Sequence, residues 1–493
     1  MCARQDYPGC PKKGLALPIK PRKLEEKKVN RTKHLVAPSL GALLVCVSQL
    51  TNATNGYFTH GIGPASKAMA GAGDARPSMA IDAANNPASG ALLAESADVG
   101  FALFAPYREY TVSDSMVNGQ MGAFTLQSSL DSVEGTVKSD RNLFAIPHFA
   151  KNWRLSEASA LTLSFYGRGG MNTTYRQGAA TFDPDGPGPA PVMTLEGTFG
   201  AGNAGVNLSQ AFLEIAYSIK VDDWTFGITP VIAYQMFEAE GLATFTPYTE
   251  TYVNALFESG QGAPASNLTN NESDTSYGVG LKAGAIWKAS EALNLSVSYA
   301  SKIGMGEFDD YSDLFAQAGG FDIPSNLRFG ASYQLNDTWT LNADVERTYY
   351  SDVDSVSNPS ANVFACPTAG QGGMDVTSCL GGDNGFGFGW QDITTYQFGV
   401  AWQQSQDRVV RFGYSRGDQP ISRADVLINT LAPGVIEQHL TLGLTQTLNN
   451  GHRLSVALMY APENSVRGTS LFDPTQSIEL SMDQYEIEVS YTF

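Results

Sequence analysis

From residue 96 onwards, apolar and polar residues alternate along most of the chain. The last ten residues show the pattern best, because Tyr485, Ile487, Val489, Tyr491 and Phe493 fall on one face and polar residues fall between them. A period of two predicts β-strands rather than helices. We therefore expect an all-β fold with fourteen strands, near 97–112, 140–153, 159–175, 205–221, 223–239, 275–289, 292–306, 322–336, 338–351, 390–404, 407–418, 435–448, 451–462 and 483–493.

The connections between these strands alternate in length. Tight turns such as Asn336-Asp337 and Asn449-Asn450 alternate with long loops, which fall at 113–139, 176–204, 240–274, 307–321, 352–389, 419–434 and 463–482. A soluble β-sandwich also has alternating strands, but it has no reason to sort its loops by length. Short turns at one end, long loops at the other and an even strand number are typical of an antiparallel transmembrane β-barrel. We predict such a barrel over residues 96–493.

Two further sets of residues fit a barrel with a filled or wet lumen. Several aromatic residues near strand ends suit the girdles at a membrane interface; they are Trp153, Tyr175, Trp224, Trp287, Trp339 and Trp390. Charged residues on the opposite strand face require polar surroundings; they are Glu214, Lys282, Arg328, Asp344, Arg411 and Glu486.

Charge separates the N-terminal part of the chain from the remainder. The net charge is −18 overall, but residues 1–53 hold ten Lys/Arg against three Asp/Glu, so residues 54–493 carry −25. The basic stretch 20–34 precedes an apolar run at 35–50 and the neutral Thr51-Asn52-Ala53. This order is that of a secretory signal, and we expect residues 1–53 to be a signal peptide with an N-terminal extension that is removed; a buried helix is the alternative. The acidic remainder argues against a nucleic-acid partner.

Residues 54–95 do not alternate and are rich in small side chains. They follow the signal and precede the first strand, so we expect a hatch that plugs the lumen. A disordered periplasmic tail is the alternative.

Few residues suggest covalent or metal chemistry. Export leaves Cys366 and Cys379, which we expect to form a disulfide, because a metal site has no histidine nearby. The motif Gly413-Tyr414-Ser415-Arg416-Gly417 matches a nucleophile elbow, but it lies in an alternating strand rather than between a strand and a helix. His148, His439 and His452 have no obvious partners. We therefore predict no enzymatic activity, no metal and no cofactor.

The chain resembles the FadL-type outer-membrane transport family. The resemblance is carried by Gly56-Tyr57-Phe58, by Gly71-Ala72-Gly73 and by Asn86-Pro87-Ala88 before the first strand, and it extends over roughly residues 54–493. It implies a fourteen-stranded barrel closed by an N-terminal hatch. It also implies uptake of hydrophobic molecules, either long-chain fatty acids or aromatic hydrocarbons.

Two long loops carry apolar clusters that suit capture of a hydrophobic solute outside the membrane. The first cluster contains Leu242, Phe245, Tyr252, Leu256 and Phe257, and the second contains Leu314 and Phe315 at the spacing of a short amphipathic helix. Packing of each loop on itself is the alternative. The resemblance places an external groove between these two loops.

The resemblance also implies a route through the barrel. A solute would contact the start of the hatch, here Phe58 and Ile62, and leave sideways through a kink in the third strand, where Gly167, Gly169 and Gly170 can produce a bend. Asn86 would anchor the hatch beside a rigid turn at Pro87 and Ala88, although an ordinary Asn-Pro turn is the alternative. A fatty carboxylate would need a cation; the candidates are Arg168, Lys282, Arg328 and Arg411.

We therefore expect a monomeric channel in the outer membrane of a Gram-negative bacterium that takes up hydrophobic molecules passively. Its other partners would be outer-membrane lipid, lipopolysaccharide and, through Phe493, the barrel-assembly machinery. A barrel that acts as an adhesin or structural surface protein is the alternative function.

Overall fold

The computed structural model describes residues 55–183 and 191–493, which all belong to one compact unit. The expected signal peptide at 1–53 lies outside the described residues. Within them, the N-terminal segment runs from Asn55 to the first barrel strand at Ser96. We call residues 55–95 the inner segment.

Fourteen antiparallel strands close into a barrel, as predicted. Closure is made by β1 and β20, which pair from Asp98–Thr492 to Val112–Ile478. The barrel strands are β1 (Ser96–Val112), β4 (Phe144–Arg154), β5 (Ser159–Tyr175), β8 (Ala204–Val221), β9 (Trp224–Phe237), β11 (Asp274–Lys288), β12 (Leu293–Ala300), β14 (Asn326–Gln334), β15 (Trp339–Thr348), β16 (Ile393–Ser405), β17 (Arg408–Gly417), β18 (Gln438–Thr447), β19 (Arg453–Thr469) and β20 (Ser477–Thr492).

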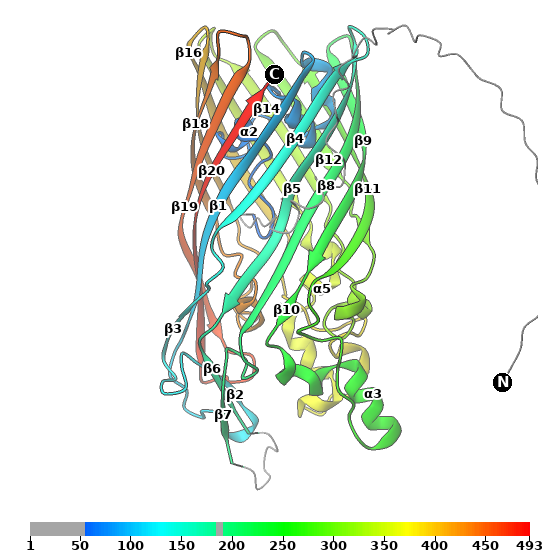
Figure 1. Cartoon of the computed structure of the whole chain (residues 1–493), viewed down its shortest axis with the longest axis vertical. Coiled ribbons are helices and arrows are strands. Elements are labelled where there is room, and N and C mark those ends of the chain that lie inside the picture. Colours follow the sequence, from blue (N-terminus) through cyan, green and yellow to red (C-terminus); the bar gives the residue numbers. More distant parts are fainter. Residues whose placement is uncertain (1–54, 184–190) are drawn as a thin grey trace, which may run out of the picture. The chain divides into compact units, whose positions relative to one another are not determined.

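Shorter elements either belong to the inner segment or extend and cover the barrel at its long-loop end (Figure 1). Three short strands continue its sheet, and three others form a separate sheet in the order β2-β6-β7. The short strands are β3 (Gly135–Lys138), β10 (Ala239–Glu240), β13 (Gly304–Met305), β2 (Phe124–Gln127), β6 (Ala179–Phe182) and β7 (Met193–Glu196). The helices are α2 (Pro64–Lys67), α3 (Glu250–Ser259), α4 (Ala316–Gly319) and α5 (Asp354–Ser357). The 3₁₀ turns are η2 (Ala80–Ala84), η3 (Pro87–Leu92), η4 (Gln120–Gly122), η5 (Ala243–Tyr248), η6 (Asp309–Tyr311), η7 (Tyr350–Asp352), η8 (Ser360–Ala365), η9 (Pro367–Ala369), η10 (Val376–Ser378) and η11 (Ile428–Thr430).

None of the helices among the described residues has the length and apolar character needed to cross a membrane.

Two sequence expectations about the loops are wrong. The region 463–482 is mostly strand, because β19 and β20 continue as a paired hairpin whose outer part is polar and therefore does not show an apolar period. The short amphipathic helix expected around Leu314 and Phe315 is broken, because the following Gln317 and Ala318 have positive φ angles of 58° and 55°.

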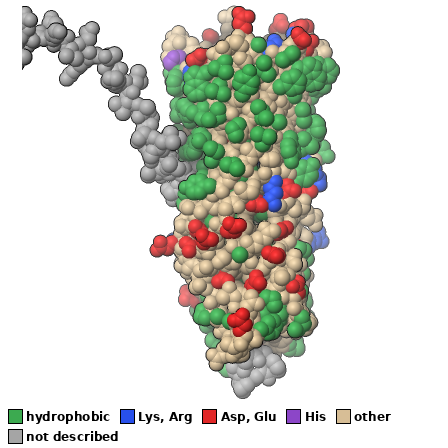
Figure 2. Space-filling view, turned by 90° about the vertical axis from the view of Figure 1, so that its right-hand side faces the viewer, with side chains coloured by type: hydrophobic (Ala, Val, Ile, Leu, Met, Phe, Trp, Pro, Cys, Tyr) green, Lys and Arg blue, Asp and Glu red, His purple; other side chains and the backbone are tan. Residues whose placement is uncertain are grey.

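Alternation along the strands separates an apolar outer face from a polar inner face. On β20, Tyr485 and Ile487 are exposed, whereas Glu486 and Glu488 are buried. Figure 2 shows the outer apolar side chains gathered in a band over the half of the barrel nearer the short turns. Near that end, Trp224 stacks on Trp287 with ring centroids 5.2 Å apart, and the facing pair Trp339–Trp402 is 5.4 Å apart.

Two of the residues expected in the interface girdles lie elsewhere. Tyr175 is fully buried and Trp390 is 2% exposed. Tyr175 donates to the Thr430 carbonyl at 3.0 Å, and Trp390 donates to Asn429 Oδ1 at 2.6 Å. Both aromatic rings therefore pack inside the protein at the long-loop end. A position near a strand end in sequence does not tell which face the side chain occupies.

The inner segment lies inside the barrel and contacts its wall on several sides (Figure 1). Its backbone donates to Asp98 on β1 and to Asp344 on β15, and its carbonyl groups accept from Asn152 on β4 and Arg453 on β19. Lys67 lies between Glu486 and Glu488 of β20, 2.8 and 2.7 Å from their carboxylates. These polar contacts satisfy the inward-facing charges that lipid could not solvate.

Glycines in the wall make room for the inner segment. A Cβ atom on Gly413 would lie 2.2 Å from the backbone carbon of Met69, and one on Gly443 would lie 2.3 Å from the Ala68 Cβ. Neither gap admits a side chain, so the backbones of wall and inner segment approach each other directly.

We predict that Gly413→Val displaces the inner segment without preventing barrel assembly. The valine side chain would overlap the Met69–Ala70 backbone, whereas a Cβ on Gly304 meets nothing within 4 Å. Gly413→Val should therefore raise single-channel conductance in planar bilayers and sensitivity of cells to large hydrophilic antibiotics. Gly304→Val is the matched control and should change neither; an unchanged conductance in Gly413→Val would contradict the prediction.

Candidate functional site

An apolar cavity lies beneath the long loops, and we call it the loop cavity. Leu242, just before η5, and Phe245 within it meet Leu314 and Phe315 from the loop at 307–321. Phe315 packs on Phe237 of β9, with ring centroids 4.6 Å apart. Among the described residues, the lining consists of Val206, Phe237, Leu242, Phe245, Leu268, Leu314, Phe315, Ser355, Leu380, Phe386, Gly387, Phe388, Ile428 and Leu431, none of which is charged.

The other loop residues expected to bind the solute lie outside the cavity lining. Thr249 caps the start of α3 through its side chain, and Gly260 ends the helix with a positive φ of 75°. On this helix Phe257 is exposed, and Leu256 is half-buried. Tyr252 packs against the apolar cluster of Val253, Cys366 and Cys379. The structure therefore brings together four of the seven expected loop residues.

The cavity lining also includes residues for which the sequence predicted no role in binding. Phe386 and Phe388 come from the loop at 352–389, and Ile428 and Leu431 come from the loop at 419–434. The alternation Gly385-Phe386-Gly387-Phe388-Gly389 is a signal that could have pointed to the first pair, because glycines let aromatic side chains approach a neighbouring backbone.

A disulfide between Cys366 and Cys379 braces this region. Next to it, the Leu380 N–H donates to the Tyr248 carbonyl at 2.9 Å, and the Leu380 carbonyl accepts from Glu250 N–H at 2.8 Å. The cross-linked loop is thereby joined to the start of α3 and to one wall of the loop cavity.

Aromatic rings connect the loop cavity with the start of the inner segment. From Phe388 the contacts run to Trp390 at 6.3 Å and on to Tyr57 at 5.8 Å. From Phe315 they run to Phe321 at 4.9 Å and on to Tyr57 at 6.3 Å. Tyr57 then contacts Phe58 at 4.6 Å.

Two tyrosine hydroxyl groups beside this region remain neutral, since burial raises the pKa of both Tyr248 and Tyr311.

Phe58 and Ile62 of the inner segment are both buried, but they face different surroundings. Phe58 lies in the aromatic contacts and under the Arg168 guanidinium, which is 4.3 Å from its ring. Ile62 lines a small polar cavity together with Lys282 and Arg328. The apolar path therefore meets polar lumen between these two residues.

The third barrel strand, β5, has a bulge where the inner segment begins. Gly167 pairs with Ala211 of β8 and Gly169 pairs with Gln210, which leaves Arg168 as an extra residue. Thr59 N–H donates to the Arg168 carbonyl at 2.9 Å, and Gly170 N–H donates to the Tyr57 carbonyl at 3.0 Å. The inner segment thus supplies hydrogen bonds to the distorted part of the strand.

The same bulge marks the end of one strand ladder. Pairing between β4 and β5 runs from Arg154–Ala160 to His148–Tyr166 and stops there. Beyond Tyr166, β5 continues to pair with β8 as far as Tyr175–Ala204. The wall therefore changes its bonding at the three glycines that the sequence singled out, Gly167, Gly169 and Gly170.

Asn86 combines a local turn with long-range contacts. Its Oδ1 accepts from Ala88 N–H at 3.0 Å and begins η3, in which Pro87 is the first residue. Its Nδ2 donates to Asp74 Oδ2 at 2.9 Å and to the Val297 carbonyl on β12 at 3.4 Å. Both interpretations of this motif, turn and anchor, describe real contacts.

Three of the four candidate lumen cations are paired with carboxylates. Glu346 bridges Arg168, at 3.2 Å, and Arg328. Lys282 lies 2.7 Å from Glu214 and also donates to the Ala84 carbonyl of the inner segment. Arg411 donates to Thr445 Oγ1 at 2.7 Å, and no ion pair of Arg411 is found in the described part of the chain.

Comparison with known proteins identifies this arrangement. The sequence profile for outer membrane protein transport proteins (OMPP1/FadL/TodX) matches residues 44–475. The chain belongs to the OMPP1/FadL/TodX family. No curated protein sequence matches the chain.

Solved structures of this family share the fold at low identity. The toluene transporter TodX of P. putida has 16% identity and a TM-score of 0.56, over 88% of this chain and 98% of that one. A FadL homologue of Pseudomonas aeruginosa has 16% identity and a TM-score of 0.57, over 89% and 99%. The toluene transporter TbuX of Ralstonia pickettii has 15% identity and a TM-score of 0.51, over 88% and 98%.

Family and fold together place the OMPP1/FadL/TodX member in the outer membrane of a Gram-negative bacterium. The apolar band then spans the membrane, and the loop cavity lies at the end with the long loops. In barrels of this kind, short turns face the periplasm and long loops face outwards.

Ser415 lies in the motif at 413–417 that matches a nucleophile elbow, and its side chain has a partner that the sequence did not reveal. Its Oγ lies 2.9 Å from His439 Nδ1, because the two residues are directly opposed on β17 and β18. His439 also stacks on His60 of the inner segment, with ring centroids 5.2 Å apart. Its Nε2 has no hydrogen-bond partner among the described residues. The pair joins wall and inner segment, and it lies within two strands rather than at a strand–helix turn.

We predict that removing the disulfide loosens the loops and leaves the barrel intact. The bond separates residues 13 positions apart, and closing a loop of that size stabilises by about 3 kcal/mol in a chain-entropy account. Cys366→Ala, Cys379→Ala and the double variant should all show faster proteolysis within 352–389, while heat-modifiable migration on a gel is retained. Equal proteolysis of wild type and double variant would show that the cross-link does not brace this region.

Proposed function

We propose that the protein takes up small hydrophobic molecules passively across the outer membrane. The observation that carries this proposal is an apolar cavity beneath the external loops whose aromatic contacts continue to Tyr57 and Phe58 of the inner segment. A solute captured in the loop cavity would follow these rings inwards. The inner segment acts as the hatch.

Neutral hydrocarbons fit this route better than fatty acids. In the part of the chain that the structure describes, no charged side chain lines the loop cavity, and Arg168, Arg328 and Lys282 already have carboxylate partners. The fourth candidate, Arg411, does not line the cavity beside Ile62. A fatty carboxylate in that part of the lumen would therefore have to displace one of these pairs, and burying a charge without a partner costs several kcal/mol. The solved relatives TodX and TbuX are toluene transporters, which supports the same choice.

The exit that we propose is sideways, at the bulge of β5. The β4–β5 ladder ends at His148–Tyr166, so movement of the hatch away from Arg168 and Gly170 would break only the few hydrogen bonds that its first residues make there. The solute would then enter the membrane without crossing the polar lumen.

Uptake by the loop cavity is tested with a charge placed in its lining. Phe315→Asp should lower the initial uptake of radiolabelled toluene at low concentration at least tenfold, because a carboxylate in this apolar site opposes solute binding. Met374→Asp, at a residue that is 76% exposed on an outer loop, is the control and should stay within twofold of wild type. Equal uptake in cells with and without the wild-type protein would refute the transport function. Oleate measured in parallel decides the substrate class, since a faster saturable uptake of oleate would contradict the preference for hydrocarbons.

Deletion of Arg168 tests the lateral exit. Removing this extra residue should restore a regular β5–β8 ladder and lower uptake to the level of cells without the protein. Arg168→Ala removes the charge but keeps the bulge, and it should retain measurable uptake. Full uptake by the deletion variant, with normal heat-modifiable migration, would exclude the bulge as the exit.

A further inference from the structure

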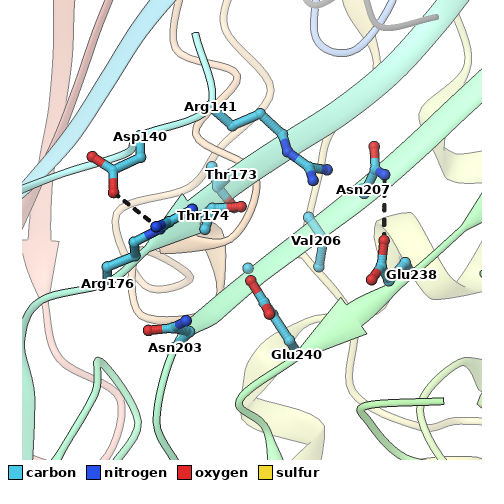
Figure 3. Close-up of a pocket in the computed structure, with 11 residues that line it drawn as sticks. Asp140, Arg141, Thr173, Thr174, Arg176, Asn203, Val206, Asn207, Glu238 and Glu240 are labelled. Carbon is cyan, nitrogen blue, oxygen red and sulfur yellow. Dashed lines mark hydrogen bonds and ion pairs between the residues drawn. The ribbon is translucent and has the colours of Figure 1, made fainter. Parts of the chain in front are cut away.

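A polar pocket of about 310 Å³ opens near the outer end of β5, β8 and β10. Figure 3 shows its charged side chains converging from two directions: Asp140 and Arg141 from the segment before β4, and Glu238 and Glu240 from the opposite side. Gly205 lies between Thr174 on β5 and Glu240 on β10, and it has no side chain to fill the space. The remaining lining residues are Thr173, Arg176, Asn203, Val206 and Asn207.

The pocket lies beyond the outer edge of the apolar band. Outward-facing side chains of β9 are apolar from Trp224 to Met236 and become acidic at Glu238. Tyr234 packs against Tyr277 of β11, with ring centroids 5.0 Å apart, as in an interface girdle. From Trp224 to Tyr234 a tilted strand rises about 25 Å, the height of the apolar band of such barrels. Glu238 is therefore about 10 Å further out, at the level of lipid headgroups.

The charges in the pocket are only partly compensated. Arg176 pairs with Asp140 at 3.3 Å, and Asn207 Nδ2 donates to Glu238 Oε2 at 3.5 Å. Within residues 55–183 and 191–493, neither the Arg141 guanidinium nor the Glu240 carboxylate has a hydrogen-bonded or ion-paired side chain. The backbone of Arg141 is held in place, since its carbonyl accepts from the buried Arg108. A free cation and a free anion thus face one polar space.

We propose that this pocket binds the phosphorylated saccharide headgroup of lipopolysaccharide in the outer leaflet. The Arg141 guanidinium is suited to a phosphate, which it can contact with two parallel N–H groups. The carboxylate of Glu240 and the amide of Asn203 can accept from and donate to sugar hydroxyl groups. With three acidic side chains and two arginines, the pocket does not favour a bare anion, so a ligand with many hydroxyl groups and one phosphate matches it best.

This site is separate from the proposed solute route. The loop cavity is lined by apolar side chains and shares only Val206 with the pocket. Lipopolysaccharide held here would contact both the segment before β4 and the outer end of β5 at Thr173 and Thr174, beyond Tyr166, where the β4–β5 ladder ends.

Native mass spectrometry of the purified full chain in detergent can test the site, with titration of lipid A–core lipopolysaccharide. Arg141→Gln and Glu240→Gln should each weaken binding about tenfold, the loss expected for one charge-assisted contact. Arg347→Gln is the matched control, because Arg347 is an exposed cation of another strand, paired with Asp392, and lies outside the pocket. It should bind within twofold of wild type. All variants are first checked for heat-modifiable migration.

Two further binding measurements test which chemical groups of the ligand the pocket recognises. Enzymatically dephosphorylated lipopolysaccharide should bind more weakly to wild type and should abolish the difference between wild type and Arg141→Gln, while Glu240→Gln still weakens binding. Glucosamine 1-phosphate should displace lipopolysaccharide only at a much higher concentration. Wild-type binding by both pocket variants, an equal loss in Arg347→Gln, or displacement by the free sugar phosphate at equal concentration would each overturn the proposal.

Discussion

Backbone hydrogen bonds that lipid cannot replace are the constraint on which this structure depends. A strand edge left open in hydrocarbon costs several kcal/mol for each unpaired group, so β1 must pair with β20 over its full length. Closure creates a lumen whose inward side chains need partners of their own. The inner segment provides them through Lys67, through its backbone contacts with Asp344 and through the bonds that its carbonyl groups accept. The inner segment is therefore part of what makes a polar inner face compatible with a closed barrel.

At the bulge in β5, the inner segment, and not the neighbouring strand β4, supplies backbone hydrogen bonds. Where the β4–β5 ladder stops, Tyr57 and Thr59 of the inner segment form hydrogen bonds with the strand. Arg168 joins the same point to the far wall, because its guanidinium reaches Glu346, which also holds Arg328. Arg328 in turn donates to the Gly71 carbonyl of the inner segment. A displacement at the start of the inner segment would therefore disturb the position of Arg168. Through Glu346 and Arg328, it would also disturb the contact at Gly71 of the same segment.

The strands could be predicted from sequence because two solvents impose the pattern. Lipid on one side and polar lumen on the other force a period of two on every spanning strand, and β5 matches its predicted range of 159–175 residue for residue. The signal weakens where the strand leaves the membrane, so the sequence pattern predicts a loop where the polar outer parts of β19 and β20 are paired strands. The same reasoning explains Tyr175 and Trp390, which lie where the outer surroundings are no longer lipid.

The candidate site was only partly predictable, because its residues come from segments that are far apart in sequence. Leu242, Phe245, Leu314 and Phe315 stood out as apolar residues in long loops, but the opposing wall from Phe386 to Leu431 depends on how the loops fold over one another. The Ser415–His439 contact depends on the register between β17 and β18, which an alternating pattern does not specify. The three glycines of β5 were found because a break in side-chain size is visible in the sequence itself.

The distribution of polarity along the proposed route bears on where a solute can leave. Burial of apolar surface contributes about 25 cal/mol per Å², and a hydrocarbon in the loop cavity keeps that contribution while it moves along Trp390, Tyr57 and Phe58. Past Phe58 the lumen is lined by Arg168, Lys282 and Arg328, and by Glu346. Movement straight on would return the solute to polar surroundings, whereas the adjoining wall faces lipid. On the proposed route, the free energy of an apolar solute at Phe58 would therefore fall in the sideways direction, through the strand that the inner segment contacts at that point.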